Sequence, residues 1–352
     1  MAATAGVVVD ADRISPEWLG AALSAPVREV TVTPVGTGQI GSVFRLEIAG
    51  PAGPARLMAK LPAADPAARA MLAGPYRQEI RFYTEIAPTV AVRVPACRYA
   101  EFTGDGTEFT LLLEDLAPAC PGDQLTGCTI AQARAAVRNL AGLHGPRWCD
   151  PTLGRIDGLS VNGPAEAEML AELYGPATEI FLDRLGELLT PDDHDTLRAC
   201  VPGIAQWLLA APERFAPTHG DYRLDNLMFA PASPSGDVQV WAVDWQTLAL
   251  GLPARDLSYF IATSLEPEQR RAHEDALVET YWDTLRGYGV GDYSLGQCRE
   301  DYGFALIQGP LVAVFGAAYG TPTPRGDRMF ATMVRRSCAA IRDWDALSRR
   351  PG

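Results

Sequence analysis

Residues 218–226 read THGDYRLDN, and residues 241–246 read WAVDWQ. The first run places Asp221 and Asn226 five residues apart on a tight loop, and Asp244 follows 18 residues after that asparagine, just after a short apolar run. Transfer of a terminal phosphoryl group asks for such a set: a carboxylate that orients the attacking hydroxyl and accepts its proton, and hard oxygen ligands for Mg²⁺. The pattern therefore predicts phosphoryl-transfer chemistry at this loop.

The basic residues are almost all arginine: of 30 Lys and Arg residues, only Lys60 is a lysine. Ala and Gly abound and Asn is scarce, as a coding bias toward GC-rich codons would produce, and under such a bias most lysines drift to arginine. A lysine that persists is a candidate for chemistry that needs a compact ammonium on a flexible stem rather than a planar guanidinium. Chance survival on the surface is the alternative.

A glycine-rich run precedes this lysine: residues 36–43 read GTGQIGSV and fit the pattern G-x-G-x-x-G-x-V. Glycines let the backbone approach a ligand closely and turn its N–H groups toward phosphate oxygens. A dinucleotide-binding turn would open a helix, whereas here a strand follows, which favours a glycine hairpin over phosphates. An ordinary glycine-rich hairpin is the alternative. The candidate phosphate contacts are Gly36, Gly38, Gly41 and Ser42.

An ammonium on the strand after this hairpin needs a carboxylate partner to hold it charged and aimed, since its neighbours are apolar. Glu79, on the helical segment that follows, is the first candidate, and Glu85 is the second. Both acids have a second interpretation as solvated residues of the helix surface.

Hydrophobic periodicity divides the chain into an α+β lobe over residues 1–113 and a larger, mostly helical lobe over residues 114–352. The first lobe is expected to follow the order β-β-β-α-β-β. Its strands are predicted at 27–35, 42–48, 56–61, 93–102 and 109–114, and its helix at 64–86, broken near Gly74-Pro75. In the second lobe helices are predicted at 130–144, 165–189, 192–211, 267–288, 297–315 and 327–347, and strands at 227–229 and 238–244.

Composition excludes several classes of protein. The 352 residues carry a formal charge of −13 without a run rich in Lys or Arg, which argues against a nucleic-acid partner. No basic segment precedes an apolar one at the start, and the longest apolar stretch, 309–320, is shorter than the roughly 18 residues of a membrane span. Seven scattered cysteines without a C-x-x-C pair indicate free thiols and no zinc site. We therefore expect a soluble cytoplasmic protein without membrane or nucleic-acid partners, monomeric or homodimeric.

Taken in order, these motifs resemble the aminoglycoside phosphotransferase and choline- and ecdysteroid-kinase-like branch of the protein-kinase-like fold. The resemblance covers most of the chain and rests on an ordered set of motifs. The set comprises the glycine run from Gly36, Lys60, Glu79-x-x-Phe82-Tyr83, residues 111–116 (LLLEDL), His219-Gly220-Asp221-x-x-x-x-Asn226, Asp244-Trp245-Gln246 and Gly251-x-Pro253-x-x-Asp256-Leu257.

The resemblance implies a two-lobed fold and a nucleotide site. By it, Lys60 holds the α- and β-phosphates of ATP, with GTP as the other nucleotide to consider, and pairs with Glu79. Glu114, Asp115 and Leu116 would form the hinge whose backbone meets the adenine ring.

The resemblance also implies the catalytic roles. Asp221 would be the base, and Asn226 and Asp244 the ligands of Mg²⁺. His219 is expected to brace the catalytic loop rather than to bind metal, and Asp256 to brace it as well. Arg223, two residues after the base, is a second catalytic candidate: it would contact phosphate or make a local salt bridge.

Departures from the protein-kinase pattern bear on the acceptor. Gly220 stands where protein kinases have the Arg of His-Arg-Asp, and Trp245-Gln246 replaces Phe-Gly. Only 11 residues separate Asp244 from Asp256, which leaves no room for a long activation segment. We therefore expect a small-molecule acceptor instead of a protein.

The main hypothesis is an ATP- and Mg²⁺-dependent O-phosphotransferase that acts on a small hydroxylated compound: an aminoglycoside or other antibiotic, an amino sugar, a nucleoside or a choline-like metabolite. An antibiotic acceptor would make it a resistance enzyme. A catalytically inactive nucleotide-binding module would be expected to lack one of Lys60, Asp221, Asn226 or Asp244, and all four are present. A metal-dependent phosphoesterase that uses His219, Asp221 and Asp244 would leave the glycine hairpin and the single lysine unexplained.

Overall fold

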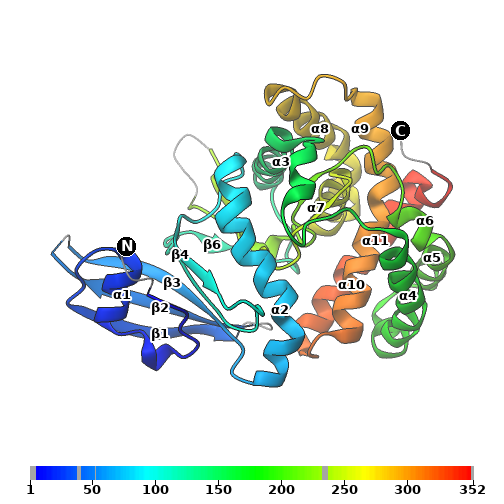
Figure 1. Ribbon diagram of the computed structural model, residues 1–352. Coiled ribbons are helices and arrows are strands. Elements are labelled where there is room, and N and C mark those ends of the chain that lie inside the picture. Colours follow the sequence, from blue (N-terminus) through cyan, green and yellow to red (C-terminus); the bar gives the residue numbers. More distant parts are fainter. Residues whose placement is uncertain (1–4, 38–40, 52, 232–236, 350–352) are drawn as a thin grey trace. The chain divides into compact units, whose positions relative to one another are not determined.

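The computed structural model describes residues 5–37, 41–51, 53–231 and 237–349 (Figure 1). The chain divides into two compact units. Unit 1 comprises Met1–Pro88, Val94–Pro118 and Val243–Thr247, and unit 2 comprises Thr89–Arg93, Ala119–Ala242 and Leu248–Gly352. The segment 243–247, far along the sequence, thus belongs to the N-terminal unit. The lobe boundary between residues 113 and 114 stays a prediction.

Unit 1 is built on a five-stranded antiparallel sheet in the order β1-β2-β3-β5-β4. The strands are β1 Glu29–Thr37, β2 Gly41–Ala49, β3 Ala55–Pro62, β4 Cys97–Phe102 and β5 Phe109–Glu114, and the helices are α1 Pro16–Leu23 and α2 Pro66–Arg81. Leu19 of α1 packs in one buried cluster with Leu46 of β2 and Leu57 of β3. Figure 1 shows the strands and helices of this unit. Because side chains alternate along a strand, Lys60 points to the face of β3 opposite to this core.

Helix α2 runs without interruption through Gly74 and Pro75, so the predicted break there is wrong. A proline removes the hydrogen bond to the carbonyl four residues earlier, here that of Met71. The Met71 residue is 81% exposed. Water can therefore satisfy that carbonyl, and the helix continues to a π-helical turn at Phe82–Ile86.

Two further predictions in unit 1 need correction. The strand expected over 93–102 begins only at Cys97, and the Arg93 backbone instead exchanges hydrogen bonds with the Asn139 side chain. Helix α1 was not predicted, because its eight residues are too few to display a clear helical period.

Unit 2 is mostly helical. Its helices are α3 Ile130–His144, α4 Pro164–Leu185, α5 Pro191–Cys200, α6 Ile204–Leu208, α7 Ala254–Ser264, α8 Pro267–Gly287, α9 Leu295–Phe304, α10 Gln308–Tyr319 and α11 Pro324–Trp344. Its strands are β6 Cys120–Pro121, β7 Ala216–Thr218, β8 Leu227–Phe229, β9 Val240–Ala242 and β10 Ala249–Gly251. They form the sheets β6-β8-β9 and β10-β7. The mixture of helices with antiparallel strands confirms the predicted α+β class.

Helix α7 is the centre of unit 2 and was not predicted. It packs against α3, α8, α9, α10 and α11, and all of its residues except Arg255 are buried. Its polar residues, among them Asp256 and Ser258, are buried in hydrogen bonds, so they do not mark an exposed face.

Other predicted elements of unit 2 prove shorter than expected. The helix expected over 192–211 is divided into α5 and α6 by a 3₁₀ turn at Val201–Gly203, which contains Pro202. Strand β9 covers only Val240–Ala242 of the expected 238–244, and Asp244 adopts a positive φ of 67°.

One helical stretch in the described part of the chain, Leu295–Tyr319, is long and apolar enough to cross a membrane by length and composition. Its apolar window is 67% buried inside the fold. Burial of this extent is typical of a core helix in a soluble protein.

Candidate active site

The lysine predicted to be functional is enclosed by carboxylates within unit 1. Lys60 Nζ lies 2.7 Å from Glu79 Oε2 and 3.3 Å from Asp244 Oδ1, and 16% of the lysine side chain is exposed. Strand β3 supplies Lys60 and α2 supplies Glu79. The second candidate partner, Glu85, instead lies 3.6 Å from Arg81. Glu79 is therefore the partner, as the sequence favoured.

Electrostatics keep this lysine charged. Burial disfavours the ammonium, but attraction to Glu79 and Asp244 outweighs burial and raises the pKa of Lys60 above its usual value. Burial likewise raises the pKa of Glu79, and the adjacent ammonium opposes that rise. The arrangement presents a fixed positive charge, which can neutralise the phosphates of a nucleotide.

The segment 243–247 is held in unit 1 by stacking and hydrogen bonds. The Trp245 ring is fully buried and stacks on Phe82, with 3.4 Å between the ring centroids. The Gln246 amide fits best with its nitrogen donating to Asp244 Oδ1 at 3.2 Å and its oxygen accepting from Lys60 Nζ at 3.0 Å. The Trp-Gln pair that replaces Phe-Gly thus anchors Asp244 beside the lysine.

The glycine hairpin is described in part. Gly36 lies in β1, and Gly38 falls outside the described residues. Gly41 and Ser42 begin β2 and pair with Pro62 and Leu61 of β3. A Cβ on Gly41 would come within 2.6 Å of the Leu61 carbonyl oxygen, so the pairing next to Lys60 requires glycine here.

The predicted hinge, Glu114 to Leu116, begins at the last residue of β5. The Glu114 N–H donates to the Ala96 carbonyl at 2.9 Å. Asp115 accepts from Arg45 Nε at 2.9 Å and from the Ala117 N–H at 3.1 Å. Leu116 is half-buried. Because these contacts fix the side chain of Asp115 to unit 1, its backbone is held in place for any contact with a base.

The predicted catalytic carboxylate lies in unit 2 and is held on both of its oxygens. Tyr259 Oη donates to Asp221 Oδ1 at 2.6 Å. Arg223 Nε and Asn226 Nδ2 donate to Asp221 Oδ2 at 3.0 and 2.9 Å. Burial and the negative charge of Asp221 raise the pKa of Tyr259 well above its usual value, so the hydroxyl stays a donor. The three donors fix the orientation of the Asp221 carboxylate.

Arg223 makes local salt bridges, one of the two arrangements expected for it. Besides Asp221 it contacts Asp225 at 3.3 Å and the Met329 sulfur at 2.8 Å. Burial opposes its charge, yet Asp221, Tyr259 and Asp225 together outweigh this effect and raise the pKa of Arg223. Arg325 of α11 contacts both oxygens of Asp225, Oδ2 at 2.8 Å and Oδ1 at 3.0 Å.

The loop at residues 218–226, predicted to be catalytic, is held by Asp256 at the start of α7. Its carboxylate accepts from the backbone N–H groups of His219 at 2.6 Å and Gly220 at 2.9 Å. The φ of Gly220 is +77°, a conformation that favours glycine. His219 is fully buried, and its Nδ1 accepts from the Asp221 N–H at 3.3 Å. These contacts are those expected of bracing residues.

Two residues that contact the predicted site residues, Tyr259 and His144, were not predicted from the sequence. Tyr259 lies three residues after Asp256 on a helix that was not predicted, so nothing marked its hydroxyl as a partner of Asp221. His144 is also fully buried, and its ring lies 3.3 Å from Asp256 and 2.7 Å from the Tyr281 hydroxyl. The sequence offers only a general reason to expect these contacts: a polar atom on a buried helix needs a hydrogen-bond partner.

Solved structures of other proteins share the fold of this chain. The chain aligns with choline kinase from Cryptosporidium parvum Iowa II over 95% of both chains, with a TM-score of 0.58 and 11% identity. It aligns with wild-type aminoglycoside 2'-phosphotransferase-IIIa in its GDP complex over 88% of this chain and 92% of that one, with a TM-score of 0.53 and 15% identity. The chain has the protein-kinase-like fold of the small-molecule kinases.

Two further comparisons agree with this fold. The microcompartment-associated aminopropanol kinase aligns with 92% of this chain and 95% of its own, with a TM-score of 0.51 and 15% identity. The model of the Ecdysteroid kinase-like family matches residues 194–288, which include the catalytic loop, Asp244 and Asp256. No curated protein sequence matches the chain. The resemblance drawn from the motifs is confirmed, and the kinase-like fold accounts for their order along the chain.

Proposed function

We propose that the chain is an ATP- and Mg²⁺-dependent phosphotransferase that moves the γ-phosphate to a hydroxyl of a small molecule. The observation that carries the proposal is the placement of the only lysine, buried between Glu79 and Asp244. If this lysine had only a structural role, Glu79 would be a sufficient partner. The second acid, Asp244, has a side chain that is 41% accessible and would not be required. A charged lysine between two acids is suited to receive phosphate oxygens.

The nucleotide half of the reaction belongs to unit 1. Lys60 would bind the α- and β-phosphates, and the backbone around Gly41 would approach them closely. Glu114 to Leu116 would meet the base. The structurally similar aminoglycoside phosphotransferase was crystallised with GDP, so GTP is tested beside ATP.

The residues present fit Mg²⁺. Asn226 turns its amide nitrogen to the Asp221 carbonyl at 3.0 Å and to its carboxylate, which leaves the amide oxygen as a hard ligand. Asp244 supplies a carboxylate. No group of three His, Cys, Asp or Glu residues suited to a metal occurs in the described chain, but Mg²⁺ is commonly held by one or two protein oxygens together with substrate phosphates. When bound, the ion would neutralise charge on the phosphates.

Asp221 would act on the acceptor. Its carboxylate would orient the acceptor hydroxyl and accept its proton as the hydroxyl oxygen bonds to the γ-phosphorus. The bond between that phosphorus and the β–γ bridging oxygen breaks, and ADP leaves. Tyr259, Arg223 and Asn226 would hold the carboxylate in place through this step.

The acceptor class follows from the fold and the charge. The named acceptors of the similar structures, choline, aminopropanol and aminoglycosides, combine an amine with a hydroxyl. The net charge of −13 is compatible with such cations. We therefore place amine-bearing alcohols first among the small hydroxylated acceptors, ahead of nucleosides and neutral sugars.

The cellular setting follows from the thiols. All seven cysteines are free in the structure, although some lie at the surface. Free thiols support a reducing compartment such as the cytoplasm.

The test is a coupled ADP-release screen over aminoglycosides, nucleoside antibiotics, choline-like amines and sugars, with Mg²⁺ and either ATP or GTP. Mass spectrometry then checks each active mixture for one added phosphate on the acceptor. Asp221→Ala serves as the inactive control. Hydrolysis of phosphate esters without any nucleotide, or acceptor phosphorylation that persists in Asp221→Ala, would contradict the proposal.

A further inference from the structure

A row of alternating charges leads from the predicted base to helix α11. Arg223 Nε lies 3.0 Å from Asp221, and Arg223 Nη1 lies 3.3 Å from Asp225. Asp225 in turn contacts Arg325, the second residue of α11, at 2.8 Å. Arg325 also contacts Asp123, in the loop before α3, at 3.0 Å. Two guanidinium groups therefore alternate with three carboxylates, and all five residues belong to unit 2.

The geometry at Asp225 shows that Arg325 orients this carboxylate. Arg325 Nη1 donates to Asp225 Oδ2 at 2.8 Å, and Arg325 Nη2 donates to Asp225 Oδ1 at 3.0 Å. Two hydrogen bonds from one guanidinium fix both the place and the rotation of a carboxylate. The Gln124 N–H adds a third donor, to Asp225 Oδ1 at 3.0 Å. The Asp225 side chain is 16% exposed, so water can replace these donors only in part.

The oxygen of Asp225 that Arg325 holds also holds Arg223. Asp225 Oδ2 accepts from Arg223 Nη1 at 3.3 Å. Because a guanidinium is planar and rigid, the place of Nη1 decides where Nε of Arg223 lies relative to Asp221. Without Arg325, Asp225 would keep Arg223 as its one cationic partner among the described residues. Asp225 would then compete with Asp221 for that guanidinium.

We propose that Arg325 is a positioning residue, which holds Asp221 in the geometry for transfer through Asp225 and Arg223. The inference rests on the proposed phosphotransferase function, in which Asp221 is the base. The structure records no contact between Arg325 and Asp221, so the effect passes through the two residues between them. A displacement of about 1 Å in a reacting group can cost on the order of 100-fold in rate. The ion pairs of Arg325 therefore matter for more than the small stability of a surface pair.

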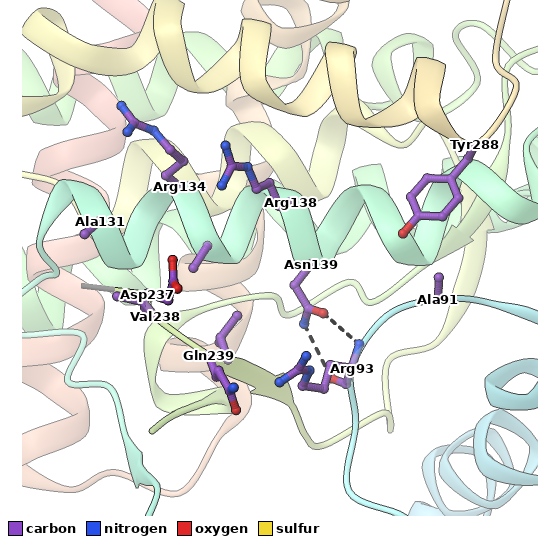
Figure 2. Close-up of a pocket in the computed structure, with 12 residues that line it drawn as sticks. Ala91, Arg93, Ala131, Arg134, Arg138, Asn139, Asp237, Val238, Gln239 and Tyr288 are labelled. Carbon is purple, nitrogen blue, oxygen red and sulfur yellow. Dashed lines mark hydrogen bonds between the residues drawn. The ribbon is translucent and has the colours of Figure 1, made fainter. Parts of the chain in front are cut away.

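Steady-state kinetics of Arg325→Gln test this role with the best acceptor from the screen. We expect kcat to fall about tenfold, the cost of one charge-assisted hydrogen bond, while KM for ATP stays unchanged because the predicted nucleotide residues lie in unit 1. The matched controls are Arg328→Gln on α11 and Arg138→Gln on α3. Both remove an exposed arginine that forms no ion pair with a described residue, and Figure 2 shows the second. Circular dichroism confirms that each variant is folded.

Two further variants separate positioning from a merely structural attachment of α11. Asp123→Asn removes the other acid that Arg325 contacts but leaves the link to Asp225, so kcat should stay within about twofold of native. Arg325→Gln/Asp225→Asn should lose no more activity than Asp225→Asn alone, because residues that act through one another are not additive. Native kcat in folded Arg325→Gln, an equal loss in Asp123→Asn, or additive losses in the double variant would overturn the proposal.

A crystal structure of the Arg325→Gln chain gives a readout that needs no activity. Arg223 should turn toward Asp225, with its Nε beyond hydrogen-bond distance of Asp221 Oδ2. Retention of that hydrogen bond would overturn the inference, even in a chain that transfers no phosphate. Displacement of Arg223 in a protein whose native chain transfers no phosphate would support the positioning contact and contradict the proposed function alone.

Discussion

Lys60 shows how far a single residue can be interpreted from sequence. Its isolation among 29 arginines marked it as a functional residue, and its strand position predicted a buried ammonium in need of an acid. The structure supplies Glu79 as that acid and adds Asp244. The second contact could not be predicted from spacing, because it joins residues 184 positions apart.

Replacing Lys60 with arginine tests whether its shape matters as well as its charge. The planar guanidinium does not fit between two carboxylates whose oxygens lie 2.7 and 3.3 Å from a single nitrogen. We expect kcat/KM for ATP to fall about 10²–10³-fold in Lys60→Arg, the usual cost of one displaced electrostatic contact. The measurement is ADP release with the best acceptor from the screen. Wild-type activity in a folded Lys60→Arg chain would contradict the proposal that phosphate binding requires the ammonium of Lys60.

Tyr259 had no sequence signal, yet its hydroxyl makes the shortest contact to Asp221 that the structure records. Loss of that hydrogen bond in Tyr259→Phe should lower kcat about tenfold while KM for ATP stays unchanged. The matched control is Tyr302→Phe, which removes another buried tyrosine hydroxyl from a carboxylate, Glu274, at 2.8 Å. Steady-state kinetics of the two variants would contradict a positioning role for Tyr259 if both lost activity equally.

At the scale of elements, α11 is held to the rest of unit 2 by a buried arginine. Arg336 is 1% exposed and donates to the carbonyls of Gln124, Leu125 and Thr263. It also pairs with Glu266, at the start of α8, at 2.6 Å. One side chain thus joins α11, the end of α7, the start of α8 and the loop before α3.

Arg336→Leu should reduce the free energy of unfolding by about 2–4 kcal/mol, because it leaves buried carbonyls without donors and removes the buried partner of Glu266. The neighbouring Arg335 contacts the same Glu266 at 3.1 Å from a half-exposed position. Arg335→Leu should therefore change stability by only about 0.5 kcal/mol. Urea unfolding, followed by circular dichroism, measures the free energy of unfolding of both variants. Equal losses of stability would show that the burial of the arginine does not decide the size of the loss.

The same ion pair predicts a dependence of stability on pH. Burial opposes the charge of Glu266, but the hydrogen bonds and positive charges of Arg336 and Arg335 together outweigh burial and lower the pKa of the carboxyl. Its stabilisation is therefore complete above the unfolded pKa, about 4.3, and is lost as the pH falls through the lower folded value. The stability difference between wild type and Glu266→Gln should be full at pH 7 and shrink toward pH 3. A difference that is constant over this range would contradict the assignment.

Elements also show where sequence patterns fail. Runs of apolar and β-branched residues predicted the strands of unit 1, and helical spacing predicted most of the long helices of unit 2. Helix α7 was missed because it is short and its polar residues, among them Asp256 and Ser258, are buried in hydrogen bonds. Helix α2 was wrongly divided because an exposed carbonyl tolerates Pro75.

At the scale of the whole molecule, the candidate site residues form two groups, and the contacts described for each group lie within one unit. Unit 1 holds Lys60, Glu79 and Asp244, and unit 2 holds Asp221 with its three donors. The order of the motifs predicts a nucleotide role for the first group and a catalytic role for the second, and both roles stay predictions. The acceptor could not be predicted, because the helices expected to contact it carry no recognisable motif.

The central claim is that Lys60 binds the nucleotide while Asp221 acts only in transfer. Equilibrium titration with the magnesium complex of the non-hydrolysable ATP analogue AMPPNP tests it without knowledge of the acceptor. We expect Lys60→Met to weaken binding at least tenfold, because it removes the charge-assisted bonds to phosphate. Asp221→Ala should bind as tightly as wild type within about threefold, a difference of well under 1 kcal/mol. Equal affinity of Lys60→Met and wild type, or no nucleotide binding by any of the three chains, would contradict the account.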